Sequence, residues 1–162
     1  DIAMAFPGFL LAILILFVAG EPGLLAVILA LSLTGWAGYA RLVRGQVLAE
    51  REREYVEAAR ALGFAESRVL LRHVLPNTVA PLLVQATFGV AGTIIAEASL
   101  SFLGLGPQDH VSWGALLDQG VTYFLLTPHL AIAPGVAIAV TVLGINFLGD
   151  GLRDVLDPRD LV

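Results

Sequence analysis

Residues 130–148 read LAIAPGVAIAVTVLGINFL, a run without a single charged side chain. A helix of about 20 residues rises ~30 Å, which is the thickness of the hydrocarbon core of a bilayer. Three further apolar runs precede this one, over residues 5–19, 23–40 and 78–103, and Glu97 is the only charge inside them. Four such runs in succession would be very unusual in a soluble protein. We therefore predict an all-α, polytopic membrane protein with four transmembrane helices.

The composition agrees with this prediction. The chain of 162 residues is 57% hydrophobic, its mean hydropathy is +0.85, and 14% of its residues are charged, against the ~25% usual in soluble domains. It contains no cysteine, which excludes a disulfide framework and a thiolate metal site. We expect one transmembrane domain over residues 1–162, truncated at its N-terminal end because the first run is short and has no basic flank.

The arginines fix the orientation of the spans. Seven of them lie in residues 41–76, whereas the connection around residues 21–23 and residues 104–128 contain none, and Arg153 and Arg159 follow the last run. By the positive-inside rule, residues 41–76 form a cytoplasmic loop and residues 104–128 an extracytoplasmic loop. Acidic residues alternate with the arginines of the cytoplasmic loop, which argues against a nucleic-acid partner.

The cytoplasmic loop has the pattern of a helical hairpin. Residues 50–62 are rich in helix formers, and Gly63 is suited to the position just past a helix C-terminus, where positive φ is favoured. A second helix is predicted over residues 66–75 and ends before Pro76, which disfavours α geometry in the preceding residue. The hairpin fits two roles equally well, a solvated connector or a docking surface for a partner protein.

One motif in this loop resembles a known family. The sequence EAARALG (57–63), nine further residues and HVLP (73–76) is similar to the EAA loop of ABC importer permeases. Only His73, at the place of an isoleucine, departs from that pattern. The positions that match are Glu57, Ala58, Ala59, Gly63, Leu75 and Pro76. The resemblance implies that the loop holds a coupling helix that docks on a cytoplasmic ATPase.

The resemblance extends over the whole chain. The sequences WAGYARLVRGQVL, AEASLSFLGLG, SWGALL and LGDGLRDVLDPRD resemble the second permease subunit of dipeptide, oligopeptide and nickel importers. It implies that the four spans are the last four of six, in a cell inner membrane, and that import proceeds by alternating access. The partners it implies are ATP-binding subunits, a sister permease in a heterodimer, an extracytoplasmic solute-binding protein and the lipid bilayer.

Catalytic and cofactor motifs are missing from the sequence. It has no GxxxxGK[ST] phosphate loop, no GxSxG elbow and no HExxH zinc pattern. We therefore expect no enzymatic activity, no cofactor and no metal site in this chain, with ATP hydrolysis on a separate subunit. His110 and His129 would matter only if nickel were the cargo, and the sequence does not name the cargo.

Glu97 is the one ionisable residue within a predicted span. Such residues usually face the bundle interior or a water-filled cavity, so Glu97 is a candidate for the pathway or an outer gate. It could instead reach the headgroups or pair within the bundle. The main alternative function is an ion-coupled secondary transporter or channel not driven by ATP, which would need several buried charges. An intramembrane enzyme or a scaffold explains the sequence less well.

Overall fold

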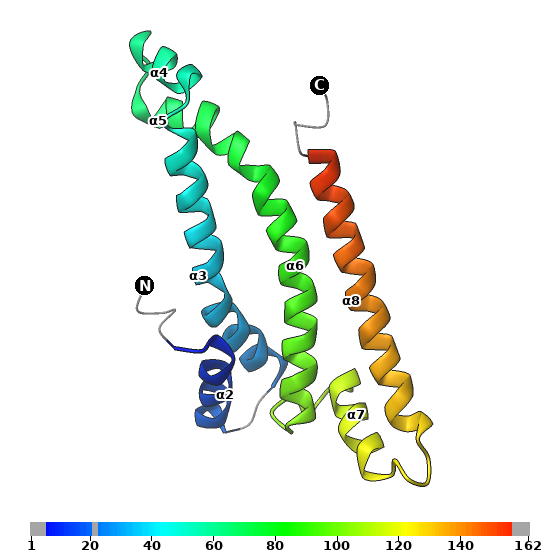
Figure 1. Ribbon diagram of the computed structural model, residues 1–162. Coiled ribbons are helices and arrows are strands. Elements are labelled where there is room, and N and C mark those ends of the chain that lie inside the picture. The colour runs from blue at the N-terminus through cyan, green and yellow to red at the C-terminus, as the bar shows by residue number, and fades with distance from the viewer. Residues whose placement is uncertain (1–5, 21–22, 157–162) are drawn as a thin grey trace.

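Three long helices form the body of the protein. The computed structural model describes residues 6–20 and 23–156, and all regular structure in these ranges is helical. Helix α6 lies between α3 and α8 and packs against both (Figure 1). The elements are α2 (Gly8–Ala19), α3 (Leu24–Glu50), α4 (Glu54–Ala61), α5 (Glu66–Val69), the π-helical turn η1 (Leu70–Val74), α6 (Leu75–Phe102), α7 (Trp113–Thr122) and α8 (His129–Leu156).

Three of the four predicted spans are long enough to cross a membrane. They are α3, the continuous helix Glu66–Phe102 of 37 residues, and α8. The run at 5–19 instead forms the 12-residue α2, which rises only ~18 Å and does not cross a bilayer by itself. Residue 5 of that run, like residues 1–4 before it, lies outside the described ranges. The described residues thus contain three helices of spanning length and one short apolar helix, which confirms that the first run is short as it stands.

The long helices carry most of their large apolar side chains on the outside. Leu143 and Phe147 of α8, for example, are 54% and 71% exposed. A membrane helix gains little by burying such side chains, because lipid is as apolar as leucine, and small residues instead bring helices together. Gly89 of α6 accordingly lies against the hydroxyl of Tyr39 on α3. The main buried cluster, which joins α2, α3 and α6, consists of Ala12, Leu16, Val27, Ala30 and Leu100.

The two ends of the body differ in charge. Helices α4 and α5 lie at the same end of the body as the C-terminal end of α8, while α7 lies at the other end (Figure 1). The arginine-rich segment and Arg153 thus lie at the same end. This arrangement agrees with the alternation of basic and non-basic connections that was read from the sequence.

The predicted loops contain more helix than expected. Helix α3 continues to Glu50, beyond the predicted end of the span at residue 40. Pro76 does not end a helix either, because it occupies the first turn of α6, where its missing N–H costs little. The turn η1 makes this possible: the N–H of Leu75 donates to the carbonyl of Leu70, five residues back. Within residues 104–128, α7 was not predicted.

Candidate functional site

The segment from 54 to 74, here called the α4–α5 unit, has a small core of its own. Side chains of α4, α5 and η1 meet there, and the end of α3 adds Val47. A short helix such as α4 is marginal by itself in water, so this packing is what holds it in place. The buried members are Val56, Ala59, Val69 and Val74, and Phe64 is partly buried against them.

The turn after α4 is a Schellman motif. Gly63 has a φ of 78°, and its N–H donates to the carbonyl of Arg60 at 2.9 Å. The N–H of Phe64 donates to the carbonyl of Ala59 at 3.3 Å. These two bonds satisfy carbonyls at the helix end that would otherwise lack partners. The prediction that Gly63 follows the helix with positive φ is confirmed.

Two polar contacts brace the unit. Arg60 of α4 binds Glu66 of α5 with both ends of its guanidinium, at 2.9 and 3.3 Å. The third nitrogen of the group, Nη1, donates to the carbonyl of Arg51 at 3.5 Å. Since Glu66 is largely exposed, the pair contributes little to stability. Its two-point geometry nevertheless fixes the orientation of α4 relative to α5.

A second brace joins α4 to the start of α6. The hydroxyl of Tyr55 donates to the carbonyl of His73 at 3.2 Å and accepts from the amide of Asn77 at 2.9 Å. The same amide donates to the His73 carbonyl at 2.8 Å. The His73 carbonyl lies in the π-helical turn η1, and it accepts hydrogen bonds from two side chains, those of Tyr55 and Asn77. The imidazole of His73 stacks on Phe64 with 6.0 Å between ring centroids, and Arg68 lies 4.7 Å from the Phe64 centroid.

The six motif positions differ in exposure and in the element on which they lie. Glu57 and Ala58 are exposed on the outer face of α4, whereas Ala59 is only 5% exposed and belongs to the core. Ala58 and Ala59 therefore lie on different faces of α4. Gly63 closes the helix, and Leu75 and Pro76 lie exposed where η1 continues into α6. Ala59 packs in the same buried cluster as Val74, the residue just before this junction, so the helix that Gly63 closes is attached to the start of α6.

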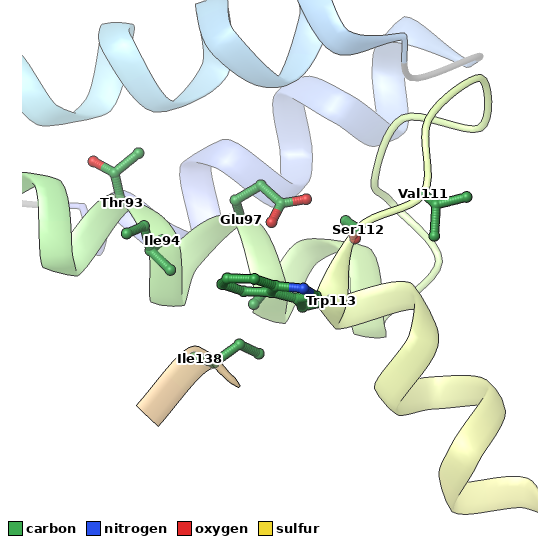
Figure 2. A pocket seen from close by; sticks show the side chains of 8 residues that line it. Thr93, Ile94, Glu97, Val111, Ser112, Trp113 and Ile138 are labelled. Carbon is green, nitrogen blue, oxygen red and sulfur yellow. The ribbon is translucent and has the colours of Figure 1, made fainter. Parts of the chain in front are cut away.

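Glu97 lies near the far end of α6, ~32 Å along the helix from Pro76. Its carboxylate accepts a hydrogen bond from the hydroxyl of Ser101 at 2.6 Å. The carboxylate borders a pocket of about 420 Å³ between α6, the start of α7 and α8. Figure 2 shows Glu97, Ser112 and Trp113 around this space, with Thr93 and Ile94 one turn further along α6.

Glu97 also borders a second pocket, of about 410 Å³, on the α3 side of α6. Leu31, Trp36 and Tyr39 of α3 line it, together with Thr93 and Glu97. Glu97 is thus a half-buried carboxylate between two mostly apolar cavities. The sequence placed it in a span but could not show that two cavities meet there.

Helix α7 closes one side of the first pocket, and the sequence did not reveal it. The hydroxyl of Ser112 accepts from the N–H of Ala115 at 3.1 Å and caps the helix. Gly114 lies directly against the backbone of Ala98 on α6, where a Cβ atom would clash. The available signal was Ser112, a good N-cap residue, in front of an apolar segment.

Comparison with known proteins places these features in a family. Residues 1–160 match the family described as "Binding-protein-dependent transport system inner membrane component". The chain is 46% identical to the "Glutathione transport system permease protein GsiD" of Shigella dysenteriae serotype 1 (strain Sd197), covering 98% of this chain and 52% of that protein. It is 45% identical to the protein of the same name from Escherichia coli O1:K1 / APEC, with the same coverage.

A third relative has a different printed name. The chain is 50% identical to the "Putative peptide transport system permease protein" of Brucella suis biovar 1 (strain 1330), covering 98% of this chain and 54% of that protein. The chain therefore spans about half the length of these relatives. They are transport permeases by name, which agrees with the fold class and with the resemblance seen in the sequence.

Proposed function

Because this chain belongs to the family of binding-protein-dependent transport system inner membrane components, we propose that it forms part of the translocation pathway of an ATP-driven importer. Its cargo is a peptide or a related small solute such as glutathione, in line with the names of its relatives. Nickel, which the resemblance also allows, has less support. The protein itself is not an enzyme, and ATP is hydrolysed by a separate subunit.

The α4–α5 unit is the contact with the ATPase. The observation that carries this proposal is the combination of an exposed outer face on α4 with a braced inner face. Glu57 and Ala58 are accessible, while the core around Ala59 and the Arg60–Glu66 pair attach α4 to its surroundings. A docking helix can transmit a displacement only if it does not slide on its own protein, and these contacts prevent sliding.

The unit is joined to two spans. Helix α3 leads into α4 after a turn of three residues, and α5 continues through η1 into α6. A displacement of α4 by the ATPase would thus tilt both spans as rigid bodies, the kind of change that underlies alternating access. In this proposal residues 41–76 face the cytoplasm, and residues 104–128, including α7, face the extracytoplasmic side.

Other partners complete the assembly. The exposed apolar faces of α3, α6 and α8 are covered by lipid, by the part of the relatives' length that this chain does not span, and by a sister permease in a heterodimer. An extracytoplasmic binding protein delivers the cargo on the side of α7. Alternating access requires two states of this assembly that the ATPase favours differently.

Site-specific crosslinking tests the proposal. Ala58→Cys in a cysteine-free, complete permease, assembled with its ATPase and sister subunit, should crosslink to single cysteines in the ATPase, and nucleotide should change the yield. Ala59→Cys is the matched control, because Ala59 follows Ala58 in the sequence but is buried, so a cysteine there should react much less. The loop is only a connector if Ala58→Cys gives no crosslink in an active complex. Uptake that persists without ATP and follows an ion gradient would instead favour a secondary transporter.

A further inference from the structure

Within the described residues, Glu97 makes no hydrogen bond or ion pair to another helix. Its one hydrogen-bond partner within residues 6–20 and 23–156 is Ser101, which lies one turn away on the same helix. A carboxylate in a membrane span is costly and is kept mainly where it serves a pathway or a ligand. We therefore expect the Glu97 carboxylate to bind a cationic ligand.

The described residues that line the pockets at Glu97 supply no such cation. In the part of the chain that the structure describes, neither an arginine nor a histidine lines the two pockets that meet at Glu97. His110 lies on the connection to α7, where its imidazole is 3.6 Å from Asp109. The carboxylate is therefore open toward whatever enters these cavities.

Aromatic residues line both of the pockets that Glu97 borders. The indole of Trp113 lines the first pocket together with Glu97 (Figure 2). Trp36 and Tyr39 line the second one. A carboxylate next to aromatic faces is the combination that binds organic ammonium groups, because the rings attract the cation and the carboxylate neutralises it. The volumes of about 420 and 410 Å³ lie in the range of small-molecule sites.

We propose that Glu97 and Trp113, which line the first pocket together, bind the ammonium group of the transported solute. This inference rests on the proposed function and specifies its cargo as a solute with a free amino group. Peptides and glutathione both carry such a group. Ser101 is a positioning residue, because its hydroxyl directs one carboxylate oxygen and leaves the other for the ligand.

A comparison of two probes tests this site. The complete permease, assembled with its sister subunit and ATPase in lipid nanodiscs and without the binding protein, is titrated with labelled trialanine and with N-acetyl-trialanine. Acetylation removes the ammonium and keeps the rest of the peptide. Wild type should bind trialanine at least about tenfold more tightly, the size of one hydrogen bond to a charged group. Glu97→Gln should abolish that difference and leave N-acetyl-trialanine binding unchanged.

Two further variants keep the test decisive. Asp118→Asn removes an exposed carboxylate of α7 that lines neither pocket, and it should behave as wild type. If Glu97→Gln does not assemble, Trp113→Leu should weaken trialanine binding a few-fold without affecting the acetylated probe, and Trp113→Phe should restore part of it. Both variants leave Glu97 in place.

The outcomes separate this inference from the proposed function. ATP-dependent uptake of trialanine is measured in parallel, in vesicles that contain the binding protein. Suppose that wild type transports trialanine but does not bind either probe measurably, or binds both equally well. In that case, or if Glu97→Gln discriminates between the probes as well as wild type does, the ammonium site is wrong and the importer proposal stands. If the intact complex transports neither glutathione nor trialanine, the proposed function falls and this inference falls with it.

Discussion

Replacement of Gly63 is the sharpest test of the α4–α5 unit. With a φ of 78° this residue closes the Schellman motif after α4. A Cβ atom built at Gly63 would meet nothing within 4 Å. The effect of Gly63→Ala is therefore the backbone penalty alone, without a steric clash. Few substitutions in the chain isolate one energy term so cleanly.

The magnitude follows from the conformation. A left-handed backbone costs an L-residue about 1–2 kcal/mol, so the α4 cap should open about 5–30 times more often, at ~1.4 kcal/mol per factor of ten. Gly63→Asn should cost less than Gly63→Ala because asparagine tolerates this region better. Gly63→Val should cost more because its side chain is β-branched. The predicted order of stability is Gly, Asn, Ala, Val.

Hydrogen–deuterium exchange of the complete, assembled permease measures this opening. The amides of Gly63 and Phe64 donate the two bonds of the cap, so a peptide over residues 54–64 should exchange faster in the predicted order. Gly45→Ala is the matched control, since Gly45 lies within α3 and a Cβ there also meets nothing within 4 Å. Equal exchange in the Asn and Ala variants, or no change in either, would refute the reasoning.

Two further substitutions probe other contacts. Tyr55→Phe removes the hydroxyl that joins α4 to α6 and should lower the stability of this contact by about 1 kcal/mol. Faster proteolysis or faster amide exchange of α4 would show the loss. Tyr123→Phe, in the exposed turn after α7, is the control and should have no such effect. Gly114→Ala places a methyl group against the backbone of Ala98 and should destabilise the docking of α7 by about 1–3 kcal/mol. A lowered melting temperature of the complex would show it, and Gly92→Ala, which has open space, should leave the temperature unchanged.

The sequence predicted those features that depend on local chemistry. The charge-free run at 130–148 became part of α8, and the positive φ of Gly63 was expected from its place after an alanine-rich helix. The family was also visible in the sequence, because its motif extends over twenty residues with fixed spacing. Each of these features is determined by residue type and by neighbours close along the chain.

The features that the sequence missed depend on contacts between distant residues. Pro76 predicts a helix end, but η1 shifts the hydrogen-bond pattern by one residue and lets the helix continue. The burial of Ala59 beside the exposed Ala58 depends on its packing with Val69 of α5 and Val74 of η1. The cavities at Glu97 require α3, α6, α7 and α8 at once, and periodicity carries no information about them.

The helix from Glu66 to Phe102 is continuous, so a tilt of this helix at its α5 end also moves its far end. Its arm from Glu66 to Glu97 is ~46 Å long at 1.5 Å per residue, so a tilt of about 5° about one end moves the other by ~4 Å. That displacement exceeds the length of a hydrogen bond. In the proposed importer, a small stroke at the ATPase would therefore suffice to withdraw the carboxylate from a bound ammonium, without any relay of side chains between them.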